Sequence, residues 1–270
     1  MPLVSAIQMT SGPDVSANLR DALRLLEEAA GSGAQLAALP ENFCFMGLSD
    51  GDKRGVAEED GRGPVQDFLA ESARRLGIWI VGGTVPLHSG ADGRVAAACL
   101  VYDSAGKRRA RYDKIHLFDI QVPERSESYR ESANVAPGSA PVVVETPVGR
   151  LGLSVCYDVR FPELFRKLSA AGAEVLAVPS AFTEPTGRAH WETLLRARAI
   201  ENLCWLIAPA QSGFHPNGRE TYGDSMIVDH WGRVLERLPR GRGCITAEID
   251  LERQRRDRRS FPSLTHRVFN

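Results

Sequence analysis

The stretch GRLGLSVCYDVRFPEL, residues 149–164, carries the pattern that decides the fold. Its apolar run Leu151–Val155 is typical of a buried strand, Cys156 follows directly, and a helix with proline in its first turn is expected to begin at Pro162. A turn from strand to helix holds a side chain at the open end of a sheet, fixed by rigid elements yet accessible to substrate. We therefore expect Cys156 to act as a nucleophile.

Apolar runs typical of strands alternate with helical patterns along the rest of the chain. The first helical pattern has apolar residues at three- and four-residue steps: Leu19, Leu23, Leu26 and Ala30. Further ones cover Pro64–Leu76, Pro162–Ala171 and Ala189–Asn202. Strand-like runs cover residues 3–9, 35–39, 78–81, 95–102, 142–145, 151–155, 175–178 and 205–210. The alternation predicts an α/β fold.

Two other strand-like runs end near ionisable residues. Pro40 and Glu41 close the run 35–39, and Lys114 follows another run. A thiol nucleophile needs a proton acceptor, and a carbonyl under attack needs a positive group where the oxyanion develops, so Glu41 and Lys114 are suited to join Cys156. Taken singly, each would more commonly be a loop carboxylate or a solvated lysine. The remaining cysteines are expected to be small buried hydrophobic residues: Cys44, Cys99, Cys204 and Cys244.

With these residues the chain resembles the nitrilase, or carbon–nitrogen hydrolase, superfamily. The family signatures are a Glu in a Pro-Glu pair, a Lys in a Lys-x-His-Leu segment and a Cys followed by Tyr-Asp-x-Arg-Phe-Pro-Glu; all three occur here in family order. The resemblance covers essentially the whole chain. It implies one domain over residues 1–270, built as an α-β-β-α sandwich with pseudo-twofold symmetry. The hairpin-like stretches 101–107 and 227–233 would be matching outer elements of that sandwich.

The resemblance also implies a catalytic set of Glu41, Lys114 and Cys156. Glu41 would take the thiol proton, and Lys114 with the backbone N–H of Tyr157 would stabilise the oxyanion. An acid and ammonia would leave through a thioester intermediate. Glu131 matches a family carboxylate beside the lysine and is expected to hold Lys114 and orient the substrate.

Segments 189–201, 210–213 and 222–226 look most like the deaminated-glutathione amidase branch, whereas 114–120 looks more like the omega-amidase branch, which acts on 2-oxoglutaramate. Both branches cleave an amide of a small 2-oxo acid. Arg160, Arg188 and His190 are candidates to contact such a substrate, and Arg188 replaces a proline found in these branches. A true nitrilase and a catalytically idle binding protein on the same fold stay open as alternatives.

Composition limits the remaining classes. The 270 residues are 43% apolar and 25% charged, with a net charge of −1, so no overall field favours nucleic acid or an anionic membrane. The basic run 253–259 is expected to be a solvated helix face or an arm to another subunit. Five cysteines without close pairing, and no signal peptide pattern, favour a cytoplasmic protein. We expect no metal, no cofactor, and, by the resemblance, a homodimer or an assembly of dimers.

Overall fold

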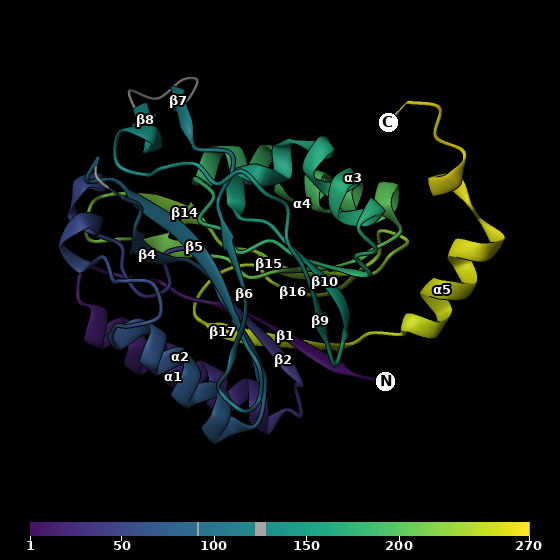
Figure 1. Cartoon of the computed structure of the whole chain (residues 1–270), viewed down its shortest axis with the longest axis horizontal. Helices are drawn as coiled ribbons and strands as arrows, with labels where there is room; N and C mark the ends of the chain where they lie inside the picture. The colour runs from purple at the N-terminus through teal and green to yellow at the C-terminus, as the bar shows by residue number, and fades with distance from the viewer. Residues whose placement is uncertain (91, 122–127, 270) are drawn as a thin grey trace.

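The computed structural model describes residues 1–90, 92–121 and 128–269, and stacks two β-sheets between two pairs of helices (Figure 1). Helices α1 (Val15–Gly31) and α2 (Pro64–Leu76) cover the outer face of the first sheet. Helices α3 (Pro162–Ala170) and α4 (Glu184–Asn202) cover the outer face of the second. This is the α-β-β-α sandwich expected from the sequence.

Each sheet has a parallel centre and antiparallel flanks. The first has the order β17-β1-β2-β3-β5-β4, with β6 also paired to β5, and the second has the order β16-β15-β12-β11-β10-β9. The first sheet consists of β1 (Leu3–Gln8), β2 (Leu36–Leu39), β3 (Trp79–Gly82), β4 (Val85–His88), β5 (Val95–Tyr102), β6 (Arg108–Asp113) and β17 (Gly243–Glu248). The second consists of β9 (Val143–Thr146), β10 (Gly149–Leu153), β11 (Val175–Ala177), β12 (Trp205–Ala208), β15 (Ser225–Val228) and β16 (Val234–Leu238).

The two halves share a common arrangement of strands, although β4 of the first sheet has no counterpart in the second. Parallel β1, β2 and β3 followed by antiparallel β5 and β6 correspond to parallel β10, β11 and β12 followed by antiparallel β15 and β16. The registers agree, because Leu36 pairs with Trp79 as Val175 pairs with Trp205. Glu41 of the first half therefore stands where Ser180 stands in the second.

The matching hairpins close by the same hydrogen bonds. The Asp103 carboxylate accepts from the N–H groups two and four residues later, at 3.0 and 2.9 Å, and the Asp229 carboxylate does so at 2.9 and 2.8 Å. Gly106 and Gly232 follow with φ of 75° and 84°, a conformation that glycine adopts without strain. The Asp-x-x-Gly pattern in the sequence thus marks equivalent turns.

Apolar side chains fill the space between the sheets and the space under the helices. In β2, Leu36 and Ala38 join the core between the sheets, whereas Ala37 and Leu39 pack in the cluster that contains α1 and α2 residues such as Leu26. This alternation is the two-residue period of a strand. It leaves the ends of the central strands as the place where polar groups gather.

Three smaller elements complete the fold. The two-stranded ribbons are β7 (Asp119–Gln121) with β8 (Ser128–Arg130), and β13 (Ser212–Phe214) with β14 (Glu220–Tyr222). The basic run forms helix α5 (Leu251–Ser260), to one side of the sandwich (Figure 1). Its buried Gln254 donates to the carbonyls of Glu174 and Leu203, at 2.8 and 2.7 Å, while most of its arginines stay solvated. In the described part of the chain, no helix combines the length and apolar character needed to cross a membrane.

Helix α4 begins five residues earlier than the sequence pattern predicts. Its N-cap is Thr183, in extended conformation, and Pro185 lies in its first turn. Gly187 lies inside the helix, and glycine is needed there because a Cβ would come within 2.3 Å of the Tyr222 side chain. Arg188 is consequently a helical residue, although the predicted pattern began one residue after it, whereas His190 lies in the helix as predicted.

Candidate active site

Cys156 lies at the end of β10 in a conformation that non-glycine residues rarely adopt. Its φ is 49°, and its backbone N–H donates to the carbonyl of Pro179 at 2.9 Å. A left-handed conformation costs an L-residue about 1–2 kcal/mol. Such strain persists only where the surroundings enforce it, and it is concentrated at functional sites.

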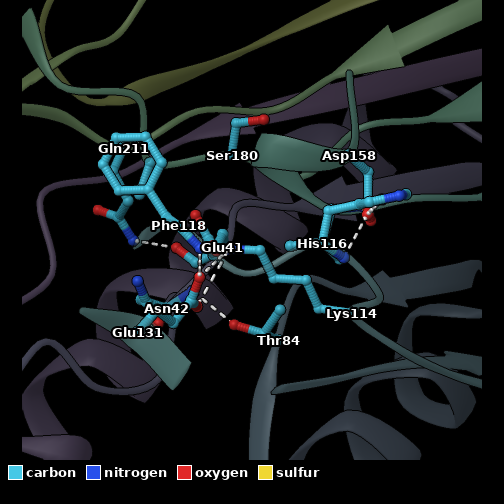
Figure 2. Close-up of polar contacts among 12 residues, drawn as sticks. Glu41, Asn42, Thr84, Lys114, His116, Phe118, Glu131, Asp158, Ser180 and Gln211 are labelled. Atoms are coloured by element: carbon cyan, nitrogen blue, oxygen red, sulfur yellow. Dashed lines mark hydrogen bonds and ion pairs between the residues drawn. The ribbon is translucent and has the colours of Figure 1, made fainter. Parts of the chain in front are cut away.

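Asp158 enforces the turn from within. Its fully buried carboxylate accepts from the Val155 N–H at 2.8 Å, the Tyr112 hydroxyl at 2.7 Å and the His116 N–H at 3.0 Å. The His116 ring also meets Asp158 through Nδ1 at 2.7 Å (Figure 2) and stacks on Phe161 at 3.7 Å. The carboxylate thus ties the nucleophile turn to the segment that follows β6.

Glu41 follows β2, and its main chain is held from two sides. Gln211 donates from Nε2 to the Glu41 carbonyl at 3.1 Å, and the next N–H, of Asn42, donates to the Thr84 hydroxyl at 2.8 Å (Figure 2). Gly83 makes room for this segment, because a Cβ there would lie 2.0 Å from the Pro40 carbonyl oxygen. Glu41 itself is almost fully buried.

Lys114 joins the two carboxylates. Its Nζ donates to Glu41 Oε1 at 2.8 Å and to Glu131 Oε2 at 2.8 Å and Oε1 at 3.1 Å (Figure 2). The Phe118 N–H donates to Glu131 Oε2 at 2.7 Å, which orients that carboxylate. Burial favours the neutral amine, but Glu131 and then Glu41 outweigh it and raise the pKa of Lys114 well above its usual value. The ammonium is therefore charged at neutral pH.

The thiol is protonated at rest. Burial, and then the charge of Glu41, raise the pKa of Cys156 well above its usual value, against the lowering effect of Lys114 and of the Ala181 backbone N–H. The Glu41 side chain is within hydrogen-bonding reach of the thiol. A neutral thiol beside a carboxylate is suited to transfer its proton as it attacks, so the arrangement needs no preformed thiolate.

One pocket brings together five of the residues singled out in the sequence. It is lined by Glu41, Lys114, Glu131, Cys156 and Tyr157. The same pocket is lined by Asn42, Asp50, Lys53, Phe118, Tyr129, Asn134, Val135, Ala181, Phe182, Thr186 and Arg219. Acid–base, cationic and nucleophilic groups thus share a partly apolar cavity, as the chemistry of amide hydrolysis requires.

The three candidates for substrate contact lie outside this lining. Arg160 places its guanidinium over the rings of Tyr157 and Phe182, at 5.8 and 5.3 Å, and contacts His190 Nδ1 at 3.3 Å. His190 is exposed. Arg188 is 73% exposed at the side chain and pairs with Glu184 one helical turn away. The helical start of α4 explains this outcome for Arg188, because it directs that side chain along the helix surface.

Sequence reasoning missed the cations that do line the pocket, Lys53 and Arg219. Lys53 lies in the 3₁₀-helical segment Asp50–Val56, and Arg219 lies at the hairpin between β13 and β14. Neither position has an apolar period around it, and Arg219 falls between the family-like segments 210–213 and 222–226 rather than within one. Only the three-dimensional contact between these loops and the strand ends reveals them.

Among the described residues, no three or more His, Cys, Asp or Glu side chains are placed to hold a metal ion. A buried lysine, two carboxylates and a thiol in one pocket are the groups that hydrolysis through a covalent cysteine intermediate uses.

Comparison with known proteins identifies the family. The carbon-nitrogen hydrolase family matches residues 3–259, so the chain belongs to that family of hydrolytic enzymes. The "Deaminated glutathione amidase" of Synechocystis sp. (strain PCC 6803 / GT-S) is 44% identical over 270 residues, which cover 99% of this chain and 98% of that protein.

Two solved structures share the fold. Saccharomyces cerevisiae Nit3, described as a member of branch 10 of the nitrilase superfamily, superposes with a TM-score of 0.89 at 29% identity, covering 99% of this chain and 97% of that one. A mutant of the amidase from Nesterenkonia sp. AN1 superposes with a TM-score of 0.80 at 28% identity, covering 97% of this chain and 98% of that one. That structure is described as showing Michael addition of acrylamide at the active-site cysteine.

Proposed function

We propose that this protein is a cysteine-dependent amidase that hydrolyses an amide of a small 2-oxo acid, with deaminated glutathione as the preferred substrate. The observation that carries the proposal is the buried Lys114 ammonium, bonded to Glu41 and Glu131 in the pocket that also contains Cys156. The substrate follows the name of the 44% identical relative.

In the proposed reaction, Cys156 attacks the amide carbonyl while Glu41 accepts the thiol proton. Lys114 and the Tyr157 N–H stabilise the oxyanion, which is where electrostatic catalysis gains most. Protonated Glu41 then gives its proton to the departing nitrogen, and the C–N bond breaks to leave a thioester. Glu41 next activates water, which releases the acid and restores the thiol. Glu131 keeps Lys114 in place.

The leaving group depends on the amide. Deaminated glutathione carries an N-substituted amide, so its hydrolysis releases 2-oxoglutarate and the amine of cysteinylglycine. Ammonia leaves only from primary amides such as 2-oxoglutaramate. The release of ammonia expected from the sequence therefore applies to the omega-amidase alternative and not to the favoured substrate.

The proposal extends to the state of the enzyme. We place it in the cytoplasm, as one domain that assembles as a homodimer or as an assembly of dimers. The odd number of cysteines supports a reducing compartment, and the continuous core between the two sheets supports a single unit.

Product analysis across three substrates tests the function. Purified protein is incubated with deaminated glutathione, 2-oxoglutaramate and an aliphatic nitrile, and 2-oxoglutarate, ammonia, amide and acid are quantified. We expect the highest kcat/KM for deaminated glutathione, with 2-oxoglutarate and cysteinylglycine in equal amounts. Faster turnover of 2-oxoglutaramate would assign the omega-amidase activity. Turnover of the nitrile alone would make the protein a nitrilase, and no turnover with any amide or nitrile would favour the idle binding protein.

A further inference from the structure

Arg219 is a cation in the pocket that the proposed catalytic steps do not use. It lines the pocket together with Cys156, and its guanidinium lies 4.9 Å from the centre of the Tyr129 ring. One terminal nitrogen, Nη2, donates to the carbonyl of Ala181 at 3.0 Å. This side chain therefore lies between the hairpin and the wall of the catalytic pocket.

Most of the hydrogen-bonding capacity of Arg219 is unused. A guanidinium has five N–H donors, and Nε of Arg219 is buried with no hydrogen-bond partner among the described residues. Nor does any carboxylate in the described ranges form an ion pair with it. A buried donor left unpaired is costly, which makes the position favourable for a ligand that accepts hydrogen bonds.

The hairpin that carries Arg219 is fixed before any ligand binds. His215, buried, donates from Nδ1 to the Ser11 carbonyl at 2.8 Å and accepts at Nε2 from the Thr221 hydroxyl at 2.7 Å. Asn217 donates from Nδ2 to the Gly47 carbonyl at 2.9 Å. Burial lowers the pKa of His215, so the neutral ring keeps this arrangement at neutral pH. The arginine is thus attached to a preorganised turn.

Ala181 connects Arg219 to the part of the pocket wall that contains Cys156. Its carbonyl accepts from Arg219 Nη2 at 3.0 Å, its backbone N–H lowers the pKa of the Cys156 thiol, and all three residues line one pocket. An acyl chain that places its amide carbon at the thiol can therefore place its far end at the guanidinium within the same pocket.

The other charges near the pocket favour Arg219 over its neighbours. Arg160 and Arg188 are outside the lining, and Arg188 is neutralised by Glu184. Lys53 lines the pocket, but an ammonium lacks the planar pair of donors that matches a carboxylate. Asp50 also lines the pocket, and its negative charge would repel a substrate carboxylate. Binding of that carboxylate therefore requires a cation that donates hydrogen bonds to it.

We infer that Arg219 is a specificity-determining residue that binds the carboxylate of the 2-oxo acid part of the substrate, at the end opposite to the scissile amide. The guanidinium donates hydrogen bonds to this carboxylate, including from Nε, which has no partner among the described residues. The acyl chain then lies between Arg219 and Cys156. This inference rests on the proposed function and adds the group that distinguishes an acidic amide from a neutral one.

Paired substrates test the inference. Arg219→Met and Arg219→Lys are compared with wild type on deaminated glutathione, on 2-oxoglutaramate and on the C1 methyl ester of 2-oxoglutaramate, which lacks the carboxylate charge. We expect Arg219→Met to lower kcat/KM about 10- to 100-fold on both acids, mainly through KM, since it removes charge-assisted hydrogen bonds. Its kcat/KM on the ester should match wild type, and Arg219→Lys should restore part of the loss.

Arg75→Ala is the matched control, because that arginine lies on α2 at the outer layer and pairs with Glu27. It should leave all three substrates unaffected. Thermal melting of each variant establishes that the fold is intact.

Each other outcome overturns the inference. An equal loss on acids and ester gives Arg219 a structural role. A loss on deaminated glutathione alone means that it binds the cysteinylglycine part, and no loss on either acid removes it from recognition. If the wild-type protein turns over none of the amides, the proposed function fails, and that result is distinct from a failure of this inference.

Discussion

At the scale of single residues, the thiol of Cys156 is held by backbone geometry and activated by charge. The left-handed φ and the carbonyl of Pro179 fix its position, and Glu41 lies within reach of its proton. Because burial keeps the thiol neutral, the proposed mechanism depends on proton transfer during attack rather than on a thiolate formed beforehand. Substitution of Cys156 or of Glu41 should therefore stop the reaction without unfolding the protein.

We expect Cys156→Ser to reduce turnover of deaminated glutathione by at least a thousandfold, since a hydroxyl is a much weaker nucleophile in a site shaped for sulfur. Production of 2-oxoglutarate measures the loss, and circular dichroism reports the fold. Cys244→Ser, at a half-buried cysteine outside the pocket, is the control and should retain activity. A serine variant that works at the wild-type rate would remove Cys156 from the mechanism.

Lys114→Met should destabilise the protein by about 3–5 kcal/mol at pH 8, because it leaves Glu41 and Glu131 buried without their cation. The buried carboxylates would then bind protons on folding, so the stability of the variant should fall as pH rises from 5 to 8. Urea unfolding at both pH values measures the difference. Lys167→Met, at an exposed lysine of α3, is the control and should change little.

Glu131 and Lys114 should give wild type no such fall between pH 5 and 8. Burial raises the pKa of Glu131, but Lys114 outweighs burial and lowers it, so the contribution of this carboxylate is complete above about pH 4.3 and is lost as pH falls through its lower folded value. The raised pKa of Lys114 keeps its contribution complete below about pH 10.4. The lowered pKa of His215 gives wild type the opposite slope, because its contribution is complete above about pH 6.5 and declines below that value. A constant difference in stability between variant and wild type from pH 5 to 8 would show that the two carboxylates are not held by this ammonium.

Sequence patterns could identify the residues that form the catalytic pocket, but not its outer rim. Glu41 and Lys114 follow strands of the first sheet and Cys156 follows a strand of the second, so strand ends alone do not bring the three together. The family motifs around them made that prediction possible. Arg219 reaches the pocket from a hairpin held by Ser11 and Gly47, about 200 and 170 residues away in sequence. No local pattern encodes contacts of that range. The motifs pointed to Arg160 and Arg188 instead, and both lie outside the lining.

At the scale of elements, the loop after β3 controls the position of Glu41. Gly83 touches the Pro40 carbonyl so closely that any side chain must displace the backbone that carries the carboxylate. Gly77, which caps α2 with a φ of 67°, is a useful comparison because a Cβ there would meet open space. Both glycines have a positive φ, but only Gly83 is crowded by neighbouring atoms.

Gly83→Ala should therefore lower the free energy of unfolding by clearly more than Gly77→Ala, for which we expect about 1–2 kcal/mol from left-handed strain alone. It should also reduce kcat about a hundredfold, since small displacements of catalytic groups are expensive. Urea denaturation and steady-state kinetics on the same samples give both quantities. Equal effects of the two substitutions would mean that the contact with Pro40 is not important.

Element boundaries show where sequence periodicity was sufficient. The range Pro64–Leu76 was predicted without error, because proline starts α2 and glycine at its C-cap ends it. Helix α4 was predicted to start late, because Gly187 weakens a helical pattern and its reason lies in Tyr222, across the molecule. Local propensity described the first case and tertiary packing decided the second.

At the scale of the whole molecule, one apolar surface remains exposed beside the second sheet. Ile200, Trp231 and Phe261 are 48%, 53% and 53% exposed, and the rings of Trp231 and Phe261 lie 5.6 Å apart. Adjacent large apolar side chains at a surface are typical of a contact between subunits. Ile200 lies on α4, Trp231 lies in the hairpin before β16, and Phe261 follows α5. A second copy of the chain could cover all three side chains.

We expect wild type to be a dimer or larger by light scattering at micromolar concentration, and Trp231→Glu to shift it towards the monomer, because a buried charge at an interface is unfavourable. Phe214→Glu, at an apolar residue that is 73% exposed on β13, should leave the mass unchanged. A monomeric wild type with full activity would refute the proposed assembly.

The correspondence of the two halves leads to a conclusion about ancestry and engineering. Glu41 and Ser180 occupy equivalent positions after β2 and β11, yet only one is a carboxylate, and the nucleophile follows a strand of the other half. The reacting groups are thus divided between two copies of one structural unit. A chimaera that joins residues 1–137 of this chain to the second half of a relative would take its proton acceptor from one parent and its nucleophile from the other. Any hybrid that hydrolyses an amide would therefore report correct docking of halves from two different parents, which makes catalysis itself a selectable measure of compatibility.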